Sequence, residues 1–200
     1  MSVRKRPAKK GQRRKALRIV CLGWGSLVWN PGDLPVRGIW FEDGPFLPIE
    51  FARHSSGGRI TLVVMPDDFP LVRSMWKFMS VASVNEARKA LGARECSQSA
   101  EPENCVDYWP RGSKNGAVAR QIGQWARRLQ IDAVVWTNLP PKFGDENERI
   151  PTSKEVVNYL SGLTGEGRER AEEYIRKAPR QIDTNYRRAI EQELGWKPMN

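Results

Sequence analysis

The chain has 200 residues, of which 40% are hydrophobic and 28% charged, which is typical of a globular domain with a sizeable core. No apolar run approaches the roughly 18 residues that span a bilayer, and the basic N-terminus lacks the apolar segment of a signal peptide. Three cysteines, Cys21, Cys96 and Cys105, show no paired spacing. We therefore expect reduced thiols, a cytoplasmic location and no contact with a membrane.

The net charge of +10 is concentrated at the N-terminus. Residues 1–18 hold nine lysines and arginines and no acid, whereas the remainder holds 24 basic and 23 acidic residues. Because these charges repel one another and the segment has little to bury, we predict a disordered basic tail over residues 1–17. Residues 18–200 are predicted to form a single domain. The tail is either a solvated extension or a weak nucleic-acid contact.

Strand patterns dominate the first half of the chain. Short apolar segments rich in β-branched residues predict strands at 17–22, 36–41, 47–53, 59–65 and 75–81. Helical patterns follow, and two of the helices begin at capping-box sequences, Ser83 to Glu86 and Thr152 to Glu155.

The remaining predicted helices cover residues 117–129, 166–178 and 184–194, with a buried strand at 131–137 and a loop at 97–116. This order predicts an α+β fold, with a small mixed sheet or barrel and helices packed outside it.

A glycine-rich loop, Gly23-Trp24-Gly25-Ser26-Leu27, directly follows the first strand. Successive backbone N–H groups in such a loop can hold a carboxylate or an oxyanion, because glycine lets the chain turn sharply and approach a ligand closely. The loop lacks the third glycine of a dinucleotide site and the Gly-Lys-Ser/Thr of a P-loop. The alternative is a tight turn that only ends the strand.

Four segments resemble the gamma-glutamylcyclotransferase-like family, and its ChaC-like branch most. They are VCLGWGSLVWNPG at 20–32, GRITLV at 58–63, ALGARE at 90–95 and DAVVWT at 132–137. The similarity covers roughly residues 18–137 and implies the family's small mixed β-barrel or sheet with peripheral helices. Two departures stand out: Trp24 occupies the position of a family tyrosine, and residues 97–130 are longer and more helical than the matching stretch.

The resemblance implies an enzyme of glutathione metabolism that cyclises a gamma-glutamyl peptide or amide to 5-oxoproline and releases an amine. It places the catalytic carboxylate at Glu95. The implied substrate-binding residues are Gly23, Trp24, Gly25, Ser26 and Leu27. Arg53 adds a guanidinium that can clamp a substrate carboxylate. The reaction is intramolecular, so a general base and fixed N–H donors suffice, and no metal or cofactor is expected.

Other interpretations of these residues remain open. Glu50 lies within an apolar strand and rivals Glu95 as the base, although an ion pair with Arg53 or Arg59 is the favoured interpretation. Glu95 itself can be an exposed helix-end residue paired with Arg94. Cys96 can be a nucleophile activated by His54, the only histidine. The second class of function is a non-catalytic protein of this fold that binds a small ligand or nucleic acid.

Overall fold

The computed structural model describes residues 16–96, 102–110 and 116–199, so most of the predicted basic tail lies outside the described residues. The described chain is a mixed α+β structure with two mixed sheets and five α-helices, which confirms the predicted class. The sheets do not close into a barrel. No helix of the described part is long and apolar enough to cross a membrane.

The first sheet has the strand order β2-β6-β1-β8-β7. Its strands are β1 (Ile19–Gly23), β2 (Val36–Phe41), β6 (Met75–Met79), β7 (Val106–Trp109) and β8 (Ala133–Thr137). β1 runs parallel to β8, and the other pairs are antiparallel.

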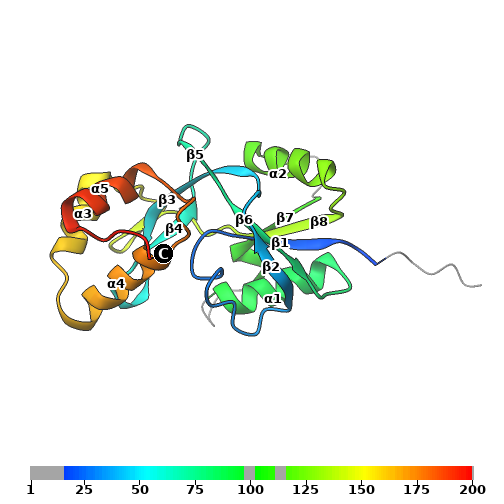
Figure 1. Ribbon diagram of the computed structural model, residues 1–200, viewed down its shortest axis with the longest axis horizontal. Helices are drawn as coiled ribbons and strands as arrows, with labels where there is room; N and C mark the ends of the chain where they lie inside the picture. Colours follow the sequence, from blue (N-terminus) through cyan, green and yellow to red (C-terminus); the bar gives the residue numbers. More distant parts are fainter. Residues whose placement is uncertain (1–15, 97–101, 111–115, 200) are drawn as a thin grey trace, which may run out of the picture.

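Helices α1 (Val84–Glu95) and α2 (Ala117–Arg128) cover opposite faces of this sheet (Figure 1). Successive side chains of a strand point to opposite faces. Accordingly, Val20 and Leu22 pack in the core cluster that includes Ile122 of α2, while Ile19 and Cys21 pack in the cluster that includes Leu91 of α1. The two covered faces explain why every residue of β1 is buried.

The second sheet is built around the long strand β3 (Phe46–His54). Its other strands are β4 (Ile60–Val64), β5 (Leu71–Arg73), β9 (Lys142–Phe143) and β10 (Glu146–Asn147). Helices α3 (Ser153–Ser161), α4 (Gly165–Lys177) and α5 (Asn185–Leu194) gather beside it (Figure 1). The short strands β5, β9 and β10 were not predicted, because two or three residues carry no usable periodicity.

Both predicted helix starts are confirmed. Thr152 forms a complete capping box with Glu155 at the start of α3. Ser83 accepts a hydrogen bond from the Glu86 backbone N–H, but the Glu86 carboxylate accepts from the N–H of Ala82 rather than from Ser83.

Two predictions about residues 96–110 were wrong. The described part of the expected loop contains a 3₁₀ turn, η2 (Pro102–Cys105), followed by strand β7. β7 pairs with β8, with Val106 opposite Thr137, and this pairing brings Cys105 back beside the end of α1. Cys96 and Cys105 form a disulfide with their Cα atoms 6.2 Å apart, so the expectation of reduced thiols fails for this pair. Cys21 is free and buried, as expected of a core thiol.

Glu50 does not pair with an arginine, contrary to one expectation. Only 2% of it is exposed, and its carboxylate lies at the first turn of α5. It accepts hydrogen bonds from the Thr184 hydroxyl and from the N–H groups of Phe51 (2.8 Å) and Tyr186 (3.2 Å). A helix N-terminus presents unsatisfied N–H groups and a positive dipole end, which suit a carboxylate. The role of Glu50 is therefore to anchor α5 on β3.

Candidate functional site

A cavity of about 780 Å³ opens between the two sheets. The cavity is lined by the loop after β1, the ends of β3 and β4, the end of α1 and the segment after β8. Every site residue expected from the sequence lines it: Gly23, Trp24, Gly25, Ser26, Leu27, Arg53 and Glu95. Glu50 is not among the lining residues.

The loop after β1 needs its two glycines for space. A Cβ on Gly23 would lie 2.7 Å from the Trp40 ring, and a Cβ on Gly25 would collide with the Tyr174 hydroxyl. The turn uses the carbonyls of Gly25 and Ser26 to accept from Val28 (2.9 Å) and Asn30 (2.8 Å). Within the described chain, no group accepts a hydrogen bond from the backbone N–H of Gly25, Ser26 or Leu27. These N–H groups are therefore available to a ligand.

Trp24 is held as a fixed wall of the cavity. Its indole is almost fully buried, and its Nε1–H donates to the Leu62 carbonyl of β4 at 3.3 Å. The side chain thus joins the two sheets. It also leaves this position without a hydroxyl.

Tyr174, on α4, brings a hydroxyl to the same place from a distant part of the sequence. It is buried, it lines the cavity, and its oxygen accepts a hydrogen bond from the Leu62 N–H at 3.3 Å. Burial raises the pKa of its phenol to about 12, so the hydroxyl keeps its proton at neutral pH. The hydrogen bond from Leu62 uses a lone pair of the tyrosine oxygen, so the hydroxyl proton is still available for donation to a ligand.

Glu95 is the last residue of α1, and 16% of its side chain is exposed. Its Oε1 accepts from Arg94 Nη1 at 2.7 Å. Arg94 Nη2 donates in turn to the Ser26 hydroxyl (3.2 Å) and the Asn30 carbonyl (2.7 Å). The arginine thus links the carboxylate to the glycine-rich loop. The alternative of an exposed helix-end glutamate paired with Arg94 is correct for the pairing and wrong for the exposure.

The electrostatics of Glu95 favour proton exchange. Burial raises the pKa of its carboxyl, and the adjacent Arg94 opposes this with its charge and hydrogen bond. Since desolvation is the larger effect, the carboxyl holds its proton more tightly than a surface glutamate.

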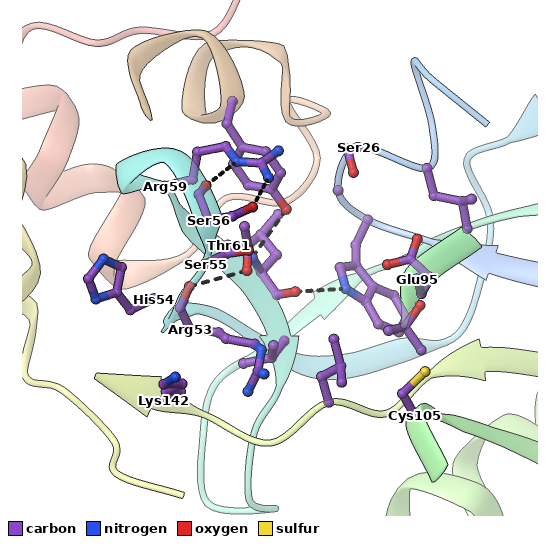
Figure 2. A pocket seen from close by; sticks show the side chains of 18 of the residues that line it. Ser26, Arg53, His54, Ser55, Ser56, Arg59, Thr61, Glu95, Cys105 and Lys142 are labelled. Carbon is purple, nitrogen blue, oxygen red and sulfur yellow. Dashed lines mark hydrogen bonds between the residues drawn. The ribbon is translucent and has the colours of Figure 1, made fainter. Parts of the chain in front are cut away.

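Basic side chains occupy the other end of the cavity: Arg53, Arg59 and Lys142 (Figure 2). Arg53 donates to the Pro140 carbonyl (2.7 Å), and Arg59 donates to the Ser56 carbonyl and hydroxyl (3.0 and 3.1 Å). In the described parts of the chain no carboxylate lies within 4.0 Å of these three cations. Burial lowers the pKa of Arg53, because desolvation disfavours the charged guanidinium.

The proposed pair of Cys96 and His54 is contradicted. Cys96 is bonded to Cys105 and has no free thiol. His54 Nε2 lies 2.7 Å from the Tyr159 hydroxyl. The pKa of His54 is lowered, first by burial and then by the charge of Lys142. In the described residues no group of three or more histidine, cysteine, aspartate or glutamate side chains could hold a metal ion.

Sequence reasoning missed Arg94, Lys142 and Tyr174 as cavity residues. The sequence identifies Arg94 only as a partner of Glu95, and the other two come from segments without any motif. Comparisons with family models, with curated proteins and with solved structures found no match to this chain.

Proposed function

We propose that the protein is a gamma-glutamylcyclotransferase-like enzyme, which converts a gamma-glutamyl peptide or amide to 5-oxoproline and a free amine. The observation that carries this proposal is the largely buried carboxylate of Glu95, which shares one cavity with N–H groups of Gly25 to Leu27 that have no acceptor among the described residues. Such a cavity provides a base and an oxyanion site facing the same bound molecule.

Glu95 acts as the general base and then as the acid. It takes a proton from the substrate's alpha-ammonium, and the freed amine attacks the gamma-carbonyl carbon. A C–N bond closes the five-membered ring, and the ring nitrogen then gives up a second proton. The original amide C–N bond breaks, and the two protons pass in turn through Glu95 to the leaving nitrogen, which departs as an ammonium. A carboxyl whose pKa is raised by burial is a better base.

The glycine-rich loop and Tyr174 stabilise the negative charge on the former carbonyl oxygen. Backbone N–H groups of Gly25 to Leu27 are the fixed donors, and the Tyr174 hydroxyl adjoins Gly25. Tyr174 supplies the hydroxyl that Trp24 does not. Donors that are already in place need no reorganisation as the charge develops.

The basic end of the cavity accepts the acidic groups that gamma-glutamyl compounds carry. Arg53 and Arg59 present guanidinium groups, which can hold a carboxylate through two parallel hydrogen bonds. With this end anchored, the flexible substrate is held folded at Glu95, and positioning of this kind supplies much of the acceleration of an intramolecular reaction.

The test is incubation of the full chain with a set of gamma-glutamyl amino acids, peptides and amines, assayed for 5-oxoproline. We expect release of 5-oxoproline that Glu95→Gln reduces about 100-fold or more, the usual scale for a general base. Absence of release from every compound by folded wild-type protein would refute the proposal.

A further inference from the structure

The Cys96–Cys105 disulfide is part of the cavity wall. Both cysteines line the cavity, and Cys105 lies on the same side as Glu95, away from Arg53 and Lys142 (Figure 2). A molecule that fills the cavity therefore contacts a disulfide, which is a group that thiolates attack.

The disulfide also fixes the end of α1. Cys96 directly follows Glu95, and its N–H donates to the Gly92 carbonyl at 2.8 Å, closing the helix. On the other side, the Cys105 carbonyl accepts from the Asn138 N–H at 2.8 Å, directly after β8. The bond thus connects the segment that carries Glu95 to the first sheet.

We propose that this disulfide is a thiol-exchange site inside the cavity, at which a low-molecular-weight thiol forms a mixed disulfide with Cys96. The incoming thiolate attacks Cys96 Sγ, a new S–S bond forms, the Cys96–Cys105 bond breaks, and Cys105 leaves as a thiolate. One thiol is consumed, no other oxidant or reductant is required, and the reverse attack by Cys105 restores the original bond.

Access selects Cys96 as the sulfur that is attacked. Cys96 is partly exposed, whereas only 4% of Cys105 is exposed. An attacking thiolate must approach its target sulfur directly, so the more accessible sulfur reacts first. Cys21 provides an internal control, because it is fully buried within β1 and that burial raises the pKa of its thiol.

The experiment uses two full-length variants, Cys105→Ser and Cys96→Ser, each of which leaves one cysteine of the pair as a free thiol. Each variant is treated with bis(2-hydroxyethyl) disulfide, and adducts are followed by intact mass and located by peptide mapping. We expect Cys105→Ser to gain one adduct on Cys96 about 10-fold faster than Cys96→Ser gains one on Cys105.

Faster modification of Cys105, equal rates, or labelling of Cys21 in the folded variants would overturn the proposal. If a variant does not fold, oxidised wild-type protein is treated with 2-mercaptoethanol and quenched with acid. A mixed disulfide mapped to Cys96 then supports the proposal, and a mixed disulfide only on Cys105, or none, overturns it.

An adduct on Cys96 places a new substituent next to Glu95. If the proposed cyclisation is correct, the labelled Cys105→Ser variant should lose 5-oxoproline release and regain it when the adduct is removed by reduction. This readout depends on the proposed function, whereas the location of the adduct does not, so the two ideas fail separately.

Discussion

Replacing Glu95 by glutamine removes the proposed base and keeps the shape of the side chain. The glutamine Oε1 can still accept from Arg94 Nη1, which now lies 2.7 Å from the carboxylate. Arg94 also keeps its hydrogen bonds to Ser26 and Asn30. The cavity should therefore retain its geometry, and the change isolates the loss of the proton acceptor.

Turnover should fall about 100-fold or more, which corresponds to roughly 2.7 kcal/mol or more of transition-state stabilisation. Stability should change by less, about 1 kcal/mol or below. The loss of a charge-assisted hydrogen bond to Arg94 is offset by the relief of a buried charge, and the raised pKa of Glu95 shows that this relief is favourable.

The pH dependence gives a second test of Glu95. Wild-type kcat/KM should rise as pH rises through the raised pKa, because the base must be ionised. The contribution of Glu95 to the free energy of unfolding changes in the opposite direction. It is present below the pKa that Glu95 has in the unfolded chain and is lost as pH rises through its pKa in the folded protein. Both steps should be absent from Glu95→Gln.

Steady-state assays of 5-oxoproline and thermal melts would be run together on wild type, Glu95→Gln and Glu50→Gln. Glu50 is the matched control, since it is also buried with a raised pKa but does not line the cavity. Full turnover by Glu95→Gln would remove it from the mechanism. If Glu50→Gln alone abolished turnover without lowering the melt, the carboxylate would have been wrongly assigned.

The remaining predictions concern stability and the oxyanion site. Glu50→Gln should cost about 1–3 kcal/mol in denaturant unfolding, because it weakens the anchor of α5. Tyr174→Phe should lower kcat and leave the melting temperature nearly unchanged. An unchanged kcat would exclude the Tyr174 hydroxyl from the oxyanion site. Gly25→Ala should lower both, since the new Cβ meets that hydroxyl. Cys105→Ser should lose about 2–4 kcal/mol of unfolding free energy by opening a short covalent loop, and unchanged denaturant midpoints would contradict this.

Local patterns in the sequence predicted the α+β class, most strands, all five helices and the N-caps Ser83 and Thr152, although only the Thr152 capping box is complete. They succeeded because alternation and helical periodicity record which face of an element is buried, and caps are satisfied by neighbours in the chain. The glycine-rich loop, Arg53 and Glu95 were also singled out from the sequence, the last through a resemblance in a six-residue segment. All of them line the cavity.

Tertiary structure decided what depends on distant segments. Tyr174 reaches the loop at Gly25 from α4, the partner of Glu50 is a helix 134 residues further along, and Cys105 meets Cys96 because β7 pairs with β8. No local pattern encodes such meetings, because they result from packing whole elements against one another. The sequence thus determined the elements and the chemistry that each carries, while the packing of two sheets and their helices decided which of these groups face one cavity.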